Sequence, residues 1–245
     1  ARTDFCISNS TFETNLFTKT FWPNAEILQY GHARNDILFA GDTAHAEHIK
    51  QYVRIRLNIP EQVKVALYAP TFRDSKSLLP YDINYPMLKA ALTKRFGGEW
   101  VILCKFHPRL QTMMRKAKDK MNLPPFVIHA TDYEDIQDLL LIADAGITDY
   151  SSWICDYVLT RRPGFIFATD LQAYYSERGF YYPLESTPFP VTRNNLELQE
   201  AILHFDEASY REKCEAFIKD KGCIDDGHAA ERIVEKLKEL MEDTE

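Results

Sequence analysis

The sequence has 245 residues, 45% of them hydrophobic and 27% charged, with a formal net charge of -7 at pH 7. This length and composition are typical of a globular protein that buries a full core, as one large domain or two small ones. The negative charge and the lack of a Lys/Arg-rich block exclude a nucleic-acid backbone as an expected partner, so any phosphate site must be local.

Short apolar segments recur along the chain and alternate with longer amphipathic stretches. The predicted strands are Phe5–Ser8, Ile27–Tyr30, Val63–Ala69, Trp100–Phe106, Phe126–His129, Ala145–Thr148 and Gly164–Ala168. Helical spacing of apolar residues predicts helices over 46–58, 85–96, 109–121, 133–144 and 151–162. This alternation predicts an α/β fold in which helices cover both faces of a parallel sheet.

The last third of the chain changes character. Residues 174–195, YYSERGFYYPLESTPFPVTRNN, are rich in aromatic residues and proline and predict an ordered loop. Helices are expected after it, over Leu196–Phe205, Glu207–Lys219 and Ala229–Met241.

The segment AGITDYSSWICDYV, Ala145–Val158, reads as a strand end, a polar turn and a helix start. The first N–H groups of a helix lack intrahelical partners, and its dipole favours negative charge there, so this turn is a candidate anion site. The alternative is an ordinary Ser or Asp helix cap. The turn contains Asp149, Tyr150, Ser151 and Ser152.

Polar residues follow three predicted strands: Thr71 and Arg73 after the third, His107 after the fourth, and Ser151 and Ser152 after the sixth. Carboxyl ends of neighbouring parallel strands meet at one edge of a sheet, where ligands bind. Arg73 would offer a bidentate cation, His107 a hydrogen-bond donor or acid, and the serine turn a set of amides. Together they suit a diphosphate without a metal.

Each of these residues also has a simpler interpretation. Arg73 lies in a polar loop, TFRDSKS, where an arginine is often only solvated. His107 precedes Pro108, which forces an extended residue before it, so the histidine could simply end a strand.

Other candidate sites are weaker. His32 follows a strand, but its surroundings also describe a turn and a helix cap. His45 and His48 lie one helical turn apart without a third metal ligand, on a charged helix. The sequence has no Gly-rich phosphate loop and no nucleophile elbow. Two carboxylate pairs read as caps or solvated loops, Glu134/Asp135 and Asp225/Asp226.

The five cysteines are scattered, without CxxC or zinc spacing, and indicate reduced thiols in a cytosolic compartment. Neither a metal nor a cofactor is expected. No apolar stretch approaches the roughly 18 residues of a transmembrane span, and the start, ARTDFCISNS, lacks the features of a signal peptide. It reads as a strand in mid-protein, so the chain is expected to be a fragment.

Several motifs together resemble the CDP-glycerol glycerophosphotransferases, the teichoic-acid primases and polymerases whose relatives also build capsule polymers. They are LYAPTFR, KFHP, DLLLIADAGITDYSSWICDYV, RRPGFIFATDLQAYYSERGFYYP and DDGHAAERIVEKL. The segment ILQYGHARNDIL also resembles the family's linker, although Ala33 replaces the usual proline of G-x-P-R-N-D.

This resemblance implies the carboxyl-terminal, donor-binding Rossmann-like lobe of a GT-B type fold. Residues 1–35 would be the end of an amino-terminal lobe and the crossover, and residues 36–245 the donor-binding lobe with its carboxyl-terminal helices. The donor diphosphate would be held by Thr71, Arg73, Ser151 and Ser152, with Asp149 and Tyr150 shaping the turn, and His107 would be catalytic.

The implied activity is transfer of a glycerol-phosphate-like unit from a CDP-activated polyol to a hydroxyl of a cell-surface polymer, with release of CMP. The family's His-Gly-Thr-Pro motif, whose histidine acts on the acceptor, does not occur here. Two alternatives stay open: a GT-B glycosyltransferase that uses a nucleotide sugar, and a non-catalytic nucleotide-binding or docking module. The first would use the same diphosphate site.

The resemblance also implies partners and a location. The expected partners are a CDP-activated polyol donor and a polymer or lipid-linked acceptor, with no nucleic acid. The expected location is the bacterial cytoplasm, at the inner face of the cell membrane, which an upstream region would contact.

Overall fold

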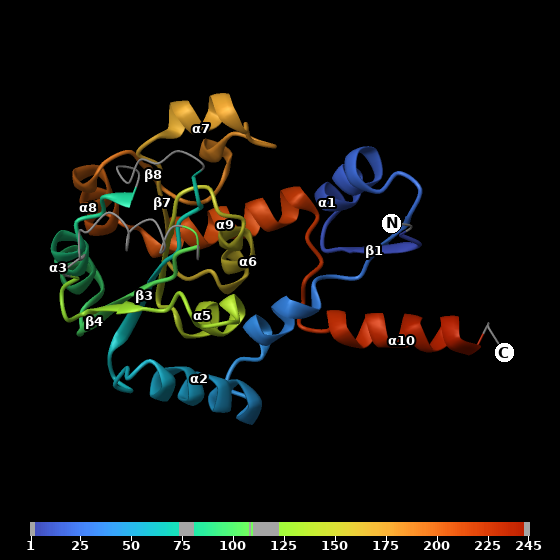
Figure 1. Ribbon diagram of the computed structural model, residues 1–245, viewed down its shortest axis with the longest axis horizontal. Coiled ribbons are helices and arrows are strands. Elements are labelled where there is room, and N and C mark those ends of the chain that lie inside the picture. Colours follow the sequence, from blue (N-terminus) through green and yellow to red (C-terminus); the bar gives the residue numbers. More distant parts are fainter. Residues whose placement is uncertain (1–2, 74–80, 108, 110–122, 243–245) are drawn as a thin grey trace.

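The computed structural model describes residues 3–73, 81–107, 109 and 123–242 (Figure 1). A six-stranded parallel sheet has the order β5-β4-β3-β6-β7-β8. Its strands are β3 (Lys64–Tyr68), β4 (Trp100–Cys104), β5 (Val127–His129), β6 (Ala145–Thr148), β7 (Gly164–Phe167) and β8 (Val191–Thr192). A separate parallel pair is formed by β1 (Phe5–Ser8) and β2 (Glu26–Gln29).

Helices connect most of these strands. They are α1 (Thr11–Leu16), α2 (Ala44–Arg56), α3 (Tyr85–Phe96), α5 (Ile136–Ile142), α6 (Trp153–Tyr157), α7 (Leu171–Glu177), α8 (Asn195–Leu203), α9 (Glu207–Lys221) and α10 (Ala229–Glu242). Helix α3 packs on α8 and α2 on α5, and the two pairs cover opposite faces of the large sheet (Figure 1). Right-handed crossovers that leave the central strand in opposite directions require this arrangement.

Close packing of α6 on the centre of the sheet depends on a glycine. All residues of β6 and β7 are buried. A Cβ atom on Gly146 of β6 would lie 2.9 Å from the ring of Tyr157 in α6. Glycine is therefore needed at this position to let the helix approach the strand.

The predicted α/β architecture matches the structure, with strand limits within about two residues at each end. The predicted loop over residues 174–195 differs, because it contains the end of α7 and the two-residue strand β8. Such a short strand, beside Pro190, gives no periodic signal. The helix predicted over 109–121 lies outside the described residues apart from Arg109.

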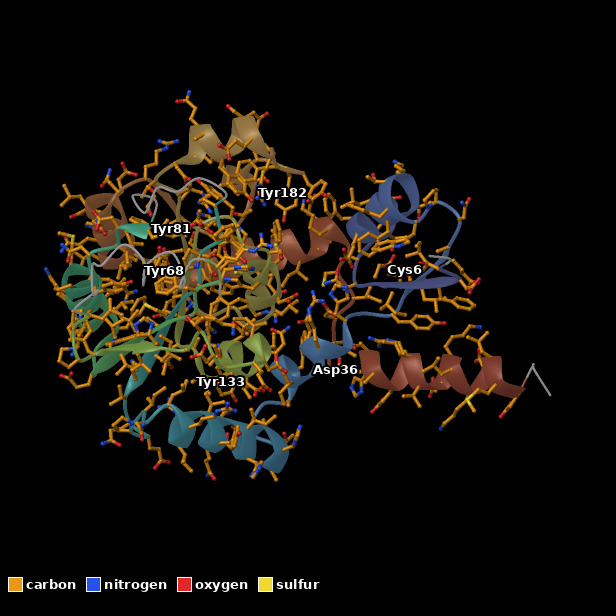
Figure 2. The ribbon with its side chains drawn as sticks, in the orientation of Figure 1. Cys6, Asp36, Tyr68, Tyr81, Tyr133 and Tyr182 are labelled. Atoms are coloured by element: carbon orange, nitrogen blue, oxygen red, sulfur yellow. The ribbon has the colours of Figure 1, made fainter. Side chains whose placement is uncertain are left out.

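Helix α10 returns to the amino-terminal pair of strands. The carboxylate of Asp36 accepts hydrogen bonds from the amides of Ala229 and Ala230, and so caps α10 (Figure 2). The guanidinium of Arg232 donates to the carbonyl of Tyr30, next to β2. The described residues include no helix long and apolar enough to cross a membrane.

Buried polar side chains fasten the segment before α2 to the large sheet. The amide nitrogen of Asn35 donates to Asp156 and to Asp225, at 3.1 Å each. Gln137 donates to the Asn35 oxygen at 2.6 Å, and Arg34 binds both oxygens of Asp156. The division of the chain between residues 35 and 36 stays a prediction.

Candidate functional site

Four of the predicted site residues meet at one edge of the large sheet. The strands they follow, β4, β3 and β6, are neighbours in that order, and all are parallel. Thr71, His107, Ser151 and Ser152 line one pocket of about 1020 Å³. This is the edge at which open α/β sheets bind their ligands. We call this cavity the rim pocket.

Thr71 brings an unsatisfied polar atom to the rim pocket. Its amide donates to Asp149 at 2.7 Å, which fixes the backbone after β3 to the turn after β6. Its hydroxyl oxygen is buried and has no hydrogen-bond partner among the described residues. A buried hydroxyl is costly without a partner, so this atom is suited to an oxygen of a bound ligand.

His107 is exposed in the rim pocket, with its ring centre 5.2 Å from that of Phe72. Its Nδ1 accepts a hydrogen bond from the amide of Arg109 at 3.2 Å. The neutral ring therefore carries its hydrogen on Nε2, and Nε2 is a donor in both protonation states.

The serine turn leads into a short helix. Ser152 occupies the N-cap position of α6, but its side chain makes no capping hydrogen bond. The carbonyl of Ser152 accepts from the amide of Cys155 at 2.9 Å, which begins the helix. The alternative of an ordinary serine cap therefore does not describe this turn, and both serines line the rim pocket.

Arg73 occupies a different position from the one expected, because its guanidinium is buried beneath the edge and does not line the rim pocket. Only 4% of the side chain is exposed. It binds both oxygens of Asp170, at 2.8 and 3.0 Å, and forms an ion pair with Asp149 at 2.8 Å. A guanidinium committed to two carboxylates is a supporting group rather than a direct diphosphate ligand.

Asp149 and Tyr150 extend this support into the serine turn. Asp149 accepts from the amide of Tyr150 at 2.5 Å in addition to that of Thr71. The hydroxyl of Tyr150 donates to Asp170 at 2.9 Å, and burial, together with Asp170, raises its pKa. The ring of Tyr150 stacks on Tyr174 of α7, 4.0 Å between centres. Asp149 therefore holds the turn to the segment after β3, and Tyr150 holds it to α7.

Three basic residues that the sequence did not single out also line the rim pocket: Arg34, Lys105 and Arg178. Arg34 is half exposed while it binds Asp156. Lys105 donates to the carbonyl of Tyr133, and burial lowers its pKa. Lys105 lies in the quoted motif KFHP, and Arg178 lies in RRPGFIFATDLQAYYSERGFYYP. The position of Lys105, two residues before His107, is the feature of the sequence that could have identified it.

The other histidines take no part in the rim pocket. The Nε2 atom of His32 lies 3.0 Å from a carboxylate oxygen of Glu13, in an adjoining cavity. His45 and His48 lie in α2, away from the lining residues. Among the described residues, no three His, Cys, Asp or Glu side chains form a group that could hold a metal ion.

The sequence also matches a family of known proteins. Residues 1–239 match the family model described as CDP-Glycerol:Poly(glycerophosphate) glycerophosphotransferase. A teichoic acid glycerol-phosphate transferase of Staphylococcus aureus is 34% identical over 246 residues, which is 96% of this chain and 60% of that protein. A teichoic acid poly(glycerol phosphate) polymerase of Staphylococcus epidermidis is 34% identical over 95% of this chain and 32% of that protein.

Solved structures give the same result. A variant of the wall teichoic acid polymerase TagF soaked with CDPG superimposes with a TM-score of 0.79 at 34% identity, over 99% of this chain and 59% of the other. The chain therefore spans about 60% or less of these relatives. The structural match confirms the predicted Rossmann-like parallel sheet of a GT-B type lobe, and the chain belongs to the CDP-glycerol:poly(glycerophosphate) glycerophosphotransferase family.

Proposed function

We propose that this chain is the donor-binding part of a glycerophosphotransferase. The enzyme moves a glycerol-phosphate-like unit from a CDP-activated donor to a hydroxyl of a cell-surface polymer such as teichoic acid or capsule, and releases CMP. One observation carries the proposal: in a chain of this family, an unpaired hydroxyl, an imidazole donor and two serines share one pocket, on Thr71, His107, Ser151 and Ser152.

The rim pocket supplies donors for a diphosphate. Nε2 of His107 and the hydroxyls of Thr71, Ser151 and Ser152 each donate to a phosphate oxygen. Arg34, Lys105 and Arg178 add positive charge to the same lining. The same lining contains the carboxylates of Asp132, Glu134 and Asp156, so its formal charges cancel. The diphosphate is therefore held by hydrogen-bond donors and nearby basic groups rather than by a net positive charge of the pocket.

The chemistry of transfer uses these hydrogen-bond donors. The acceptor hydroxyl oxygen attacks the distal phosphorus of the donor, a new P–O bond forms, and the bond from that phosphorus to the bridging oxygen breaks. CMP leaves with the electron pair, and a base takes the hydroxyl proton. Negative charge grows on the bridging oxygen, so donation from His107 lowers the barrier as a general acid or hydrogen-bond donor.

We propose that the nucleoside of the donor lies against the wall of the rim pocket beside β5. That wall follows β5 and contains Thr131, Tyr133 and Ile136. The hydroxyl oxygen of Thr131 accepts from the amide of Phe106, which fixes this wall to the end of β4. The proposed donor therefore spans the rim from β5 to β6.

A thermal-shift comparison tests the donor. A ligand that binds only the folded chain at about 100 times its Kd adds about 2.7 kcal/mol of stability, or roughly 5–10 °C for a chain of this size. We expect CDP-glycerol or CDP-ribitol to raise Tm by this amount, and UDP-glucose to do so much less. A larger shift with UDP-glucose would favour a nucleotide-sugar transferase, and no shift with any nucleotide would favour a docking module.

Variants of His107 test the assignment of the site. His107→Ala should reduce transfer by the assembled enzyme by roughly 100-fold or more, the usual contribution of a general acid. Its control is His204→Ala, since His204 is exposed on α8 and lies outside the rim pocket. Equal transfer rates for His107→Ala and the parent enzyme would exclude a catalytic role.

The proposed function also implies where the enzyme works. A lipid-linked or polymeric acceptor requires the enzyme to work at a surface, and we propose the inner face of the bacterial membrane. Flotation of the enzyme with vesicles of anionic phospholipid would measure this contact.

A further inference from the structure

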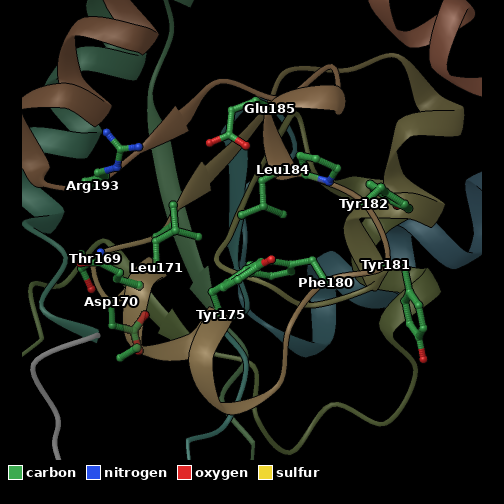
Figure 3. Close-up of a pocket in the computed structure, with 14 residues that line it drawn as sticks. Thr169, Asp170, Leu171, Tyr175, Phe180, Tyr181, Tyr182, Leu184, Glu185 and Arg193 are labelled. Atoms are coloured by element: carbon green, nitrogen blue, oxygen red, sulfur yellow. The ribbon is translucent and has the colours of Figure 1, made fainter.

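A second cavity opens at the same sheet edge, at the carboxyl ends of β7 and β8. It has a volume of about 770 Å³ (Figure 3). Asp170 lines it after β7 and Arg193 after β8, and the rest of its wall comes from α7 and the segment that follows α7. We call this cavity the α7 pocket. Its position satisfies the rule that ligands bind at the carboxyl ends of parallel strands.

The lining of the α7 pocket combines opposite charges with aromatic surface. Figure 3 shows Glu185 at the top and Arg193 at the left, with Tyr175 and Phe180 below them. Among the described residues, neither the carboxylate of Glu185 nor the guanidinium of Arg193 has an ion-pair partner. Asp170 is paired with Arg73, which it shares with Asp149. The pocket therefore offers one uncommitted cation and one uncommitted acceptor.

Two of the four aromatic side chains that line this pocket are exposed to solvent. Tyr175 is 64% exposed and Tyr181 is 67% exposed. The rings of Tyr175 and Phe180 lie 5.9 Å apart, at an angle of 39°. Exposed aromatic rings beside polar groups are typical of ligand sites. The face of a ring can stack on the C–H groups of a ligand while the polar groups beside it form hydrogen bonds.

A third cavity shares lining residues with both the α7 pocket and the rim pocket. It has a volume of about 420 Å³. It shares Phe180, Tyr181 and Tyr182 with the α7 pocket, and Ser151 and Ser152 with the rim pocket. The three cavities therefore adjoin one another, so a chain-like ligand seated in the α7 pocket would lie close to the serine turn.

From these observations we infer that the α7 pocket is an acceptor subsite, which binds a polyol-phosphate unit behind the reacting hydroxyl. Arg193 binds the phosphodiester, Glu185 accepts hydrogen bonds from free hydroxyls, and Tyr175 and Phe180 stack on the carbon chain. This inference rests on the proposed function, because it requires a polyol-phosphate acceptor.

Equilibrium binding to the 245-residue chain tests the subsite. The probe is a synthetic glycerol-phosphate tetramer, titrated calorimetrically into the parent chain, Arg193→Gln and Tyr175→Ala. We expect each variant to weaken binding roughly 10-fold or more, as loss of a charge-assisted hydrogen bond or an aromatic contact does. Raising the salt concentration should weaken binding to the parent chain more than binding to Arg193→Gln.

The matched control is Arg211→Gln, because Arg211 is an exposed arginine of α9 outside all three cavities. The Tm shift caused by CDP-glycerol is measured on the same samples and should be equal in all of them. The subsite is wrong if the parent chain does not bind the tetramer, or if both variants bind it as tightly as the parent. If CDP-glycerol does not raise the Tm of the parent chain, the proposed function is rejected instead.

Discussion

At the scale of single residues, the guanidinium of Arg73 joins the ends of three strands. It binds Asp149 after β6 and Asp170 after β7, and donates to the carbonyl of Thr71 after β3. The rings of Tyr150 and Tyr174 lie within 4.9 Å of its central carbon. Burial lowers the pKa of this guanidinium, but Asp170 and Asp149 outweigh burial and raise it, so its charge is fixed.

Replacing Arg73 should therefore cost stability first. Arg73→Met leaves two carboxylates without their cation, and we expect the free energy of unfolding to fall by about 3–5 kcal/mol. Arg73→Lys should lose less but not recover the parent value, because lysine cannot bind a carboxylate in the bidentate way. Urea denaturation measures both, with Arg211→Met as control. A loss below about 1 kcal/mol in Arg73→Met would contradict the supporting role.

The same cluster predicts a dependence on pH. Burial raises the pKa of Asp170, but bonding to Arg73 outweighs this and lowers the pKa below its ordinary value of 3.8. A carboxylate with a lowered folded-state pKa stabilises the fold above pH 3.8, and this stabilisation is lost as pH falls through the folded-state pKa. Asp170→Asn should therefore reduce the fall in stability below pH 4, measured by urea denaturation at pH 7, 4 and 3. An unchanged pH profile of stability in Asp170→Asn would show that Asp170 is not the cause of the loss of stability below pH 4.

Sequence reasoning placed four site residues correctly at one edge because that argument needs only the strand ends and a parallel sheet. It could not predict the partner of Arg73, because Asp170 lies 97 residues away and nothing in the quoted motif RRPGFIFATDLQAYYSERGFYYP marked it as the partner of a buried cation. A cation in a polar loop looks the same in sequence whether it is solvated or buried in an ion pair.

At the scale of elements, α6 sets the position of the serine turn. The helix has five residues, so its packing on β6 rather than its length holds it in place. The indole of Trp153 donates to the carbonyl of Ala69 at 2.8 Å, and the hydroxyl of Tyr157 donates to that of Ala143. Both bonds and the close approach at Gly146 tie Ser151 and Ser152 to the sheet.

Gly146→Ala should thus affect both stability and donor binding. The added Cβ must displace the ring of Tyr157, with an expected cost of about 1–3 kcal/mol. The shift of α6 should also weaken CDP-glycerol binding several-fold. The matched control is Gly164→Ala, the register partner of Gly146 on β7, whose Cβ would meet Phe189 at 2.8 Å rather than a residue of α6. Equal donor affinity in both variants would contradict the role assigned to α6.

At the scale of the whole molecule, one polar network joins the two sheets. Asn35 bridges Asp156 of α6 and Asp225, and Asp225 also accepts from the amide of His32 and the side chain of Asn9. The predicted linker motif, ARND, thus connects to the quoted motif DDGHAAERIVEKL near the other end of the chain. Sequence order gave no means of pairing these segments, 190 residues apart.

Asn35→Ala should loosen this junction while leaving the large sheet intact. It leaves Asp156, Asp225 and Gln137 each without one buried partner, and we expect a loss of about 1–3 kcal/mol. Hydrogen exchange followed by mass spectrometry should then show faster exchange in β1, β2 and α10, with β3, β4 and β6 unchanged. Asn195→Ala is the control, because Asn195 makes equivalent bonds at the exposed start of α8. Uniform acceleration over both sheets would mean that they unfold as one unit, and would reject the predicted division between residues 35 and 36.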